Sequence, residues 1–230
     1  MIIELPWDSS FFNLKIGKIE INSIDEVNFE SINYFDLIYI YSNNLLLLNN
    51  DSTLKLVDEK ITFIKKNLSN CEKLNSIKGY VVKEITKVTA DLKKLCLQSG
   101  NYSRFKNDSN FSEIMFQKLY YEWLENSVQK ILADVVFGVF HSNKIIGFIT
   151  IKNFQFSSRI GLIAIDEKYR GLGLGKLLMS YSEHYCIKNN IHSLEVVTQN
   201  NNPACEFYRS CGYMETNKTF IYHLWNKNKI

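Results

Sequence analysis

The sequence contains little proline, and nothing in it resembles a linker. Two prolines and ten glycines are spread over 230 residues, and no stretch has the Pro, Gly and Ser content of a flexible linker. Internal repeats are also missing. With 46% hydrophobic and 13% aromatic residues, the chain can bury a core, which argues against wholesale disorder. Its length predicts one large domain or two small ones.

The cysteines include no closely spaced pair. No C-x-x-C sequence occurs and their number is odd, so neither a disulfide framework nor a cysteine metal site is expected. The sequence predicts reduced thiols at all five positions, which are Cys71, Cys96, Cys186, Cys205 and Cys211.

Long hydrophobic runs and a strong excess of one charge are absent as well. The longest apolar candidate, LIYIYSNNLLLL, is interrupted by three polar residues and falls short of the roughly 20 apolar residues of a membrane span. The opening stretch MIIELPWDSS carries acids and no basic run, unlike a secretory signal. A net charge of +3 is too small to indicate a nucleic-acid partner. The prediction is a cytoplasmic protein that binds neither membranes nor nucleic acids.

Glycine is concentrated in one place, the stretch YRGLGLGKLL. Gly171, Gly173 and Gly175 alternate with leucines, and Lys176 and an apolar run follow. Alternating glycines leave backbone N–H groups uncovered, and the N-terminus of a following helix favours negative charge. The stretch therefore predicts an anion site.

Two familiar phosphate loops do not fit this spacing. A Walker loop, G-x-x-x-x-G-K-[ST], would need glycine in place of Arg170 and a hydroxyl residue in place of Leu177. A dinucleotide loop, G-x-G-x-x-G, would need its third glycine in place of Lys176. Both alternatives fail.

Hydrophobic periodicity predicts alternating strands and helices in the second part of the chain. Asn202 can cap a helix, Pro203 suits a first helical position and Gly212 suits the position after a helix end. The predicted strands are 79–87, 134–142, 144–154, 159–166, 193–199 and 219–225, and the helices are 91–99, 111–129, 174–188 and the one between Pro203 and Gly212.

The first part of the chain is less clearly patterned. Strands are expected at 15–21, 35–41 and 55–64, with a weakly marked helix at 25–32. We predict a small mixed α/β domain over residues 1–78 and a larger domain over residues 79–230.

A strand followed by R-x-x-G-x-G and a helix resembles the acyl-CoA site of the GNAT acyltransferase superfamily. A second motif, N-x-x-A-x-x-x-Y, follows at the expected distance, and together the motifs comprise Arg170, Gly173, Gly175, Asn201, Ala204 and Tyr208. The resemblance implies an α/β (α+β) GNAT fold, with a central mixed, mostly antiparallel sheet flanked by helices. It also implies acyl-CoA, either acetyl-CoA or a short hydroxyacyl-CoA, as co-substrate. The implied cofactor-binding residues are Ile163 and Ile165 through their backbone, Arg170, Gly171, Leu172, Gly173, Leu174, Gly175, Lys176, Asn201 and Ala204.

The same resemblance implies that Tyr208 is the general acid for the departing thiolate. From its spacing with Ala204, Phe207 and Cys211 alone, a core tyrosine is the alternative. The general base stays open between the acids after the strand, Asp166 and Glu167, and a chain of water molecules. The histidines have no ligand spacing and no metal is expected; they are His141, His184, His192 and His223.

More locally, the chain is similar to bacterial nucleotide-sugar N-acyltransferases of the dTDP-fucosamine N-acetyltransferase type. The matching stretches are WDSSFFNLKIGKI, LVDEKITF, YSRF, YYEWLENSV and NNPACEFYRSCGY. This similarity implies acyl transfer to a dTDP-linked amino-dideoxy sugar for O-antigen or other surface-glycan synthesis. The acceptor would be bound by residues that stack on a base or sugar or hold phosphate, namely Phe12, Tyr102, Arg104, Phe105 and Tyr121.

Several alternatives remain open at this point. The acceptor could instead be a protein N-terminus or a small amine, or the chain could be a non-catalytic CoA sensor. The sugar isomer, the acyl length and a homodimeric state are also undecided.

Overall fold

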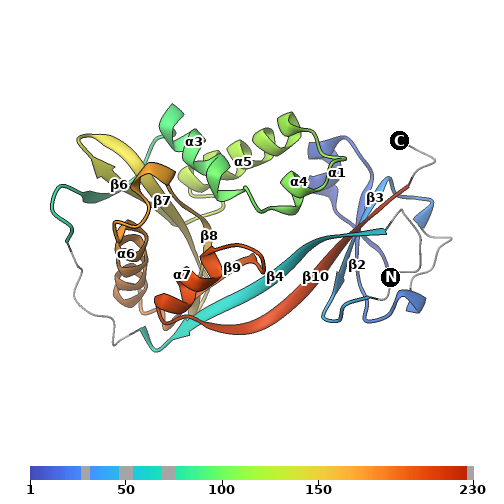
Figure 1. Ribbon diagram of the computed structural model, residues 1–230. Coiled ribbons are helices and arrows are strands. Elements are labelled where there is room, and N and C mark those ends of the chain that lie inside the picture. The colour runs from blue at the N-terminus through green and yellow to red at the C-terminus, as the bar shows by residue number, and fades with distance from the viewer. Residues whose placement is uncertain (27–31, 47–53, 69–75, 227–230) are drawn as a thin grey trace. The chain divides into compact units, whose positions relative to one another are not determined.

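The computed structural model describes residues 1–26, 32–46, 54–68 and 76–226 (Figure 1). The helices are α1 (Pro6–Phe12), α3 (Ala90–Ser99), α4 (Arg104–Asn107), α5 (Glu113–Val128), α6 (Leu174–Lys188) and α7 (Ala204–Ser210), with short 3-10 turns η1 (Ile24–Glu26) and η3 (Glu167–Tyr169). The strands are β1 (Ile3–Glu4), β2 (Ile16–Glu20), β3 (Leu37–Ser42), β4 (Leu54–Lys66), β5 (Val81–Glu84), β6 (Val135–His141), β7 (Lys144–Asn153), β8 (Ser157–Ile165), β9 (Ser193–Gln199) and β10 (Met214–Trp225).

The strands form a ten-stranded sheet in the order β1-β2-β3-β10-β4-β9-β8-β7-β6-β5. Pairing is antiparallel between β5 and β6, β6 and β7, and β7 and β8, and parallel between β8 and β9 and between β2 and β3. The predicted fold class, a mixed and mostly antiparallel sheet with flanking helices, is confirmed.

The chain divides into two compact units. Unit 1 comprises Met1–Ile61, Gln199–Asn201 and Asn217–Ile230, and unit 2 comprises Thr62–Thr198 and Asn202–Thr216. Compactness thus places part of the last strand with the N-terminal residues, whereas the sequence suggested a single boundary at residue 78. That boundary, as a functional division, stays a prediction.

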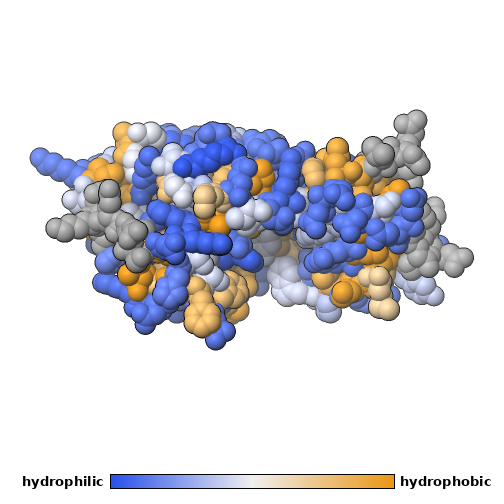
Figure 2. Space-filling view, turned by 90° about the horizontal axis from the view of Figure 1, so that it is seen from below, coloured by the Kyte–Doolittle hydropathy of each residue, from blue (hydrophilic) through white to orange (hydrophobic). Residues whose placement is uncertain are grey.

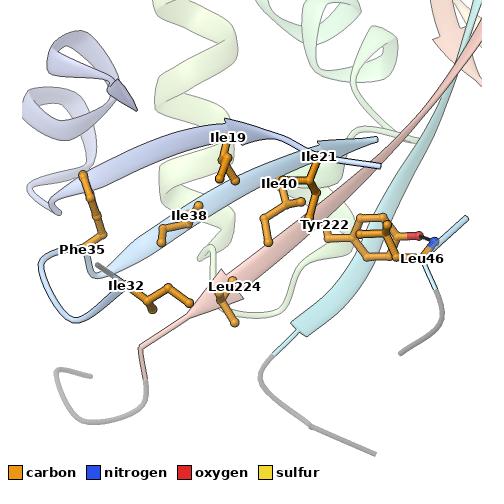
Figure 3. Packing of buried hydrophobic residues seen from close by; sticks show 9 residues of the cluster. All are labelled: Ile19, Ile21, Ile32, Phe35, Ile38, Ile40, Leu46, Tyr222 and Leu224. Atoms are coloured by element: carbon orange, nitrogen blue, oxygen red, sulfur yellow. Dashed lines mark hydrogen bonds between the residues drawn. The ribbon is translucent and has the colours of Figure 1, made fainter. Parts of the chain in front are cut away.

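Unit 1 has its own apolar core on one face of β2, β3 and β10 (Figure 3). Alternate residues of these strands point into it, because side chains along a strand alternate between the two faces. The Tyr222 hydroxyl reaches the edge of the core and accepts a hydrogen bond from the Leu46 N–H at 2.8 Å. The core residues drawn are Ile19, Ile21, Ile32, Phe35, Ile38, Ile40, Leu46, Tyr222 and Leu224.

Unit 2 covers both faces of its strands with helices. Helix α3 packs on β7 and β8 and against α5, and α6 packs on β6, β7 and β8 from the other side (Figure 1). Hydroxyl side chains at the helix starts accept hydrogen bonds from backbone N–H groups, as Thr89 does for α3 and Ser112 for α5. These caps fix where the helices begin.

Most predicted elements are confirmed, and several short ones are new. The strand at 193–199 has the predicted ends, while β10 begins at Met214, five positions before the predicted 219. Short α1 and α4 were not predicted. The predicted helix at 25–32 falls partly on residues 27–31, which lie outside the described residues.

The surface mixes polar and apolar residues. Figure 2 shows hydrophobic residues in separate groups among hydrophilic ones on one face, as folded proteins commonly have. Across the described ranges, no helix is both long and apolar enough to span a membrane.

Candidate functional site

The glycine loop passes directly into α6 and leaves its N-terminus uncapped. Gly173 is the N-cap of α6 with φ 78°, and no side chain caps the helix. The first intrahelical bond of this turn runs from the Leu177 N–H to the Gly173 carbonyl at 3.0 Å. Gly171 has φ 79° and open space where a Cβ would stand. Uncapped amides, a helix N-terminus and an unobstructed approach together suit a phosphate group such as the pyrophosphate of CoA.

Gly175 has a different reason to be glycine. A Cβ at this position would lie 2.9 Å from Cε2 of Phe207, so the missing side chain lets α6 and α7 approach each other. Among the three glycines, Gly171 and Gly173 shape the loop, whereas Gly175 permits helix packing.

Arg170 braces the loop against the end of β8. Its Nε donates to the Ile165 carbonyl at 3.1 Å, and an Nη lies 3.5 Å from Oε1 of Gln98. The residue as a whole is exposed. The arginine of the R-x-x-G-x-G motif therefore ties the loop to the end of β8.

Strands β8 and β9 separate just before the loop. Among the described residues, which include both strands in full, their parallel pairing ends at Ile160 and Val196, although β8 continues to Ile165. On the other side of β8, a bulge places Gly161 and Leu162 opposite Thr150 alone. The Leu162 N–H donates to Oγ1 of Thr150 at 2.8 Å. This threonine was missed at the sequence level, because a bulge leaves no periodic signal.

The backbone of β8 therefore presents polar groups to the gap. The Leu162 and Asp166 N–H groups both bond toward β7, the latter at 2.8 Å to a backbone carbonyl. Because N–H and C=O groups alternate in direction along a strand, those of Ile163 and Ile165 point away from β7, toward the side where β9 has departed. The bond from Arg170 to the Ile165 carbonyl agrees with this direction. An extended amide-containing ligand could pair with this edge.

Tyr208 lies in α7 and is 2% exposed. Its ring packs against Phe63, Phe207 and Tyr213, with centroid distances of 5.6, 5.3 and 6.3 Å. Burial raises the pKa of the Tyr208 phenol well above its ordinary value. The residue is thus both part of an aromatic cluster and a phenol that stays protonated in any ordinary buffer.

The other predicted cofactor residues lie as follows. Leu174 is buried, Leu172 and Lys176 are exposed, and Ala204 is the half-buried first residue of α7. Asn201 is exposed and falls in the segment assigned to unit 1. Its neighbour Asn202 accepts a hydrogen bond through Oδ1 from the Ala204 N–H at 2.9 Å, while Pro203, predicted as the first helical residue, is the N-cap of α7.

The predicted acceptor residues are divided between the two units. Phe12 is a buried residue of α1 in unit 1. In unit 2, Phe105 is buried in contact with Phe111 and Trp123, while Tyr121 is half-buried under the Lys93 ammonium. Because both are buried, Phe12 and Phe105 serve mainly as core residues of their units.

Arg104 and Tyr102 lie at the start of α4. Tyr102 is 37% exposed, whereas Arg104 is 8% exposed and its guanidinium lies 4.7 Å from the Phe105 ring centre. Little of the Arg104 side chain is therefore accessible to a ligand.

Two titratable side chains near the loop, the candidate base Asp166 and the histidine His141, make local hydrogen bonds. Asp166 accepts from the Lys168 N–H and so caps η3. His141 is hydrogen-bonded through Nδ1 to the Gly79 carbonyl at 3.0 Å. Within the described part of the chain, no group of three or more His, Cys, Asp or Glu side chains could hold a metal ion.

The arrangement agrees with the comparisons to known proteins. The Acetyltransferase (GNAT) family matches residues 102–213, which include the loop, the gap and Tyr208. No curated protein matches the chain.

Solved structures share the fold at low sequence identity. A functionally unknown conserved protein from Staphylococcus epidermidis has a TM-score of 0.64 at 10% identity, covering 92% of this chain and 84% of that chain. A GNAT-family protein from Novosphingobium aromaticivorans has 0.54 at 12%, covering 84% and 75%. A GCN5-related N-acetyltransferase from Sphaerobacter thermophilus has 0.50 at 11%, covering 81% of this chain and 59% of that chain. Residues 102–213, just under half of the chain, thus match the GNAT acetyltransferase family and carry the uncapped loop and the separated strands that suit acyl-CoA.

Proposed function

We propose that the protein transfers an acyl group from acyl-CoA to the amino group of a dTDP-linked amino-dideoxy sugar, for surface-glycan synthesis. The observation that carries the acyl-CoA half is the β8 edge left open beside the uncapped N-terminus of α6. The acceptor half is supported by the sequence similarity to nucleotide-sugar N-acyltransferases, which extends from WDSSFFNLKIGKI to NNPACEFYRSCGY.

The reaction needs from the protein a group that polarises the carbonyl, a path for the amine proton and a donor for the departing thiolate. The acceptor amine attacks the thioester carbonyl, so a C–N bond forms, the C–S bond breaks and the amine gives up a proton. Backbone N–H groups of Ile163 and Ile165 would pair with the pantetheine arm and polarise the carbonyl as its oxygen gains negative charge. The amine proton leaves through water or a nearby carboxylate, and the departing thiolate needs a donor.

Tyr208 is the proposed donor, and its burial defines how it acts. An ordinary thiol has a pKa of about 8.5, whereas burial raises the pKa of Tyr208 above that of an ordinary phenol. Complete proton transfer from the phenol to the thiolate is therefore uphill. A protonated Tyr208 instead stabilises the developing thiolate as a hydrogen-bond donor, and the thiolate takes its final proton later.

Binding of dTDP in the absence of CoA tests the acceptor assignment. A ligand that binds only the native state stabilises it by mass action, so dTDP should raise the melting temperature and release or absorb heat in a titration. Neither a protein N-terminal acetyltransferase nor a CoA sensor has a reason to bind dTDP. No heat and no thermal shift at millimolar dTDP would refute the sugar-nucleotide acceptor and leave the acyltransferase assignment intact.

Arg104 offers a residue-level form of this test. If its guanidinium forks onto the diphosphate, Arg104→Ala should weaken dTDP binding and leave the affinity for CoA unchanged. Lys106→Ala is the matched control, because Lys106 lies on the same short helix and forms its ion pair with Glu113. Equal dTDP affinity in both variants would show that Arg104 is a packing residue.

A further inference from the structure

Lys65, at the end of β4, joins two helices through its ammonium group. Nζ donates to both carboxylate oxygens of Glu183 on α6 at 2.9 Å and to the Cys211 carbonyl at 3.1 Å. The side chain of Glu183 is 7% exposed and that of Lys65 is 27% exposed. A carboxylate this buried requires a close, well-bonded partner, because removing a charge from water is costly.

The Cys211 carbonyl lies at the C-terminal end of α7, of which Cys211 is the C-cap. Cations are favourable here, because the last carbonyls of a helix lack intrahelical partners and carry partial negative charge. The next residue, Gly212, has φ 82°, and a Cβ on it would lie 3.8 Å from Cε of Lys65. Lys65 thus fits closely against the turn that ends α7.

This turn begins at Tyr208. The Tyr208 carbonyl accepts from the Cys211 N–H at 3.0 Å and from the Tyr213 N–H at 3.1 Å. The Lys65 ammonium also lies 5.7 Å from the centre of the Tyr213 ring, which packs against Tyr208. Cys211, whose carbonyl binds Lys65, is therefore hydrogen-bonded through its own N–H to the Tyr208 carbonyl.

Helix α7 is attached to α6 at two places. Near the start of α6, Phe207 packs against Gly175, where no Cβ intervenes. Farther along α6, Glu183 holds Cys211 through Lys65. The second contact lies at the other end of α7 from the start of the helix, so it opposes a rotation of α7 about Phe207 that would move Tyr208.

We propose that Lys65 is a positioning residue that fixes α7 against α6 and thereby sets the direction of the Tyr208 hydroxyl. The proposal rests on the proposed donor role of Tyr208 for its catalytic consequence. Its structural part, the control of the Tyr208 ring by Lys65, can be tested without substrate.

The first experiment is NMR of protein labelled with ¹³Cζ-tyrosine, with the Tyr208 signal assigned through Tyr208→Phe. Lys65→Met should shift or broaden that signal, and Lys65→Arg should restore it, because a guanidinium can still bind the Glu183 carboxylate. Lys66→Met is the control, since Lys66 is the exposed neighbour on the same strand and should change nothing. An unchanged Tyr208 signal in folded Lys65→Met would overturn the proposal.

Lys65→Met leaves the Glu183 carboxylate without this partner and could fail to fold. The double variant Lys65→Met/Glu183→Leu removes both charges and avoids that cost. It should fold and still show the altered Tyr208 signal. A folded double variant with the wild-type signal would also overturn the proposal.

Turnover then tests the catalytic consequence. With the acceptor that the protein uses, Lys65→Met should lower kcat by about 10- to 100-fold, the usual effect of a small misplacement, and leave the affinity for CoA within about twofold. In a Tyr208→Phe background the same change should cost almost nothing more, since residues that act through one another are not additive. Full additivity would overturn the proposal. Wild-type turnover of Tyr208→Phe would instead remove the donor role of Tyr208, while the NMR result would still decide the positioning.

Discussion

At the residue scale, the hydroxyl of Tyr208 separates a functional role from a packing role. Tyr208→Phe keeps the aromatic contacts to Phe63 and Phe207 and removes only the hydrogen-bond donor. We expect kcat to fall by about 10²- to 10⁴-fold, as for other positioned donors and acids, with little change in CoA affinity. Steady-state kinetics measure kcat, and calorimetric titration with CoA measures the affinity.

A second buried tyrosine serves as the control for that result. The Tyr222 hydroxyl accepts from the Leu46 N–H at 2.8 Å in the core of unit 1, so Tyr222→Phe should cost about 1 kcal/mol of stability. Its kcat should remain that of the wild type. Near-normal turnover in Tyr208→Phe would mean that the thiolate departs without a hydrogen bond from Tyr208 and that Tyr208 is a core residue.

At the element scale, the loop and the helix behind it make opposite predictions for two glycines. Gly173→Val places a branched side chain at φ 78°, which costs about 1–2 kcal/mol for a left-handed conformation, and obstructs the approach to the α6 amides. It should abolish CoA binding in a protein that still folds. Gly175→Val should instead force Phe207 aside and lower the free energy of unfolding by about 1–3 kcal/mol, as overpacking does.

Urea unfolding and CoA titration of both variants distinguish these outcomes. Unchanged CoA affinity in folded Gly173→Val would contradict the loop assignment, and wild-type stability of Gly175→Val would contradict the helix-packing role.

The elements that could be predicted were those with strong local signals. The strand at 193–199 alternates clearly, and the helix before Gly212 has its cap, its proline and its stop in sequence, so both were found. Helix α1 was missed because seven residues give too short a period, although Trp7 and Phe11 stack one turn apart at 5.0 Å. The early start of β10 lies in the stretch METNK, whose polar side chains are mostly exposed.

The candidate site divides in the same way. The glycine loop could be found because its residues are adjacent in sequence and their spacing excludes other phosphate loops. The pair of Lys65 and Glu183 could not, because 118 positions separate the two residues and neither lies in a motif. The bulge opposite Thr150 depends on one side-chain hydrogen bond within a folded ladder, which no apolar period records.

At the scale of the whole molecule, buried acidic groups link stability to alkaline pH. Burial raises the pKa of the Cys96 thiol from 9.0 to about 12 and that of the Cys186 thiol from 9.0 to about 11. Burial likewise raises the pKa of the Tyr208 and Tyr213 phenols. In the unfolded chain these groups titrate at their ordinary, lower values. Above about pH 9 the folded state therefore holds more protons than the unfolded state, which makes stability fall as pH rises.

The stability that the two thiols contribute should be fully present below pH 9 and be lost between pH 9 and pH 12. Each unit of pKa difference corresponds to about 1.4 kcal/mol, so several kcal/mol should disappear across this window. Urea unfolding at a series of pH values measures the slope, and Cys96→Ala/Cys186→Ala controls for lysine and tyrosine titration. The double variant starts from a less stable fold, because each truncation leaves a small cavity, yet its stability should fall less steeply above pH 9. Parallel slopes for the variant and the wild type would show that neither thiol is held in its protonated form by burial.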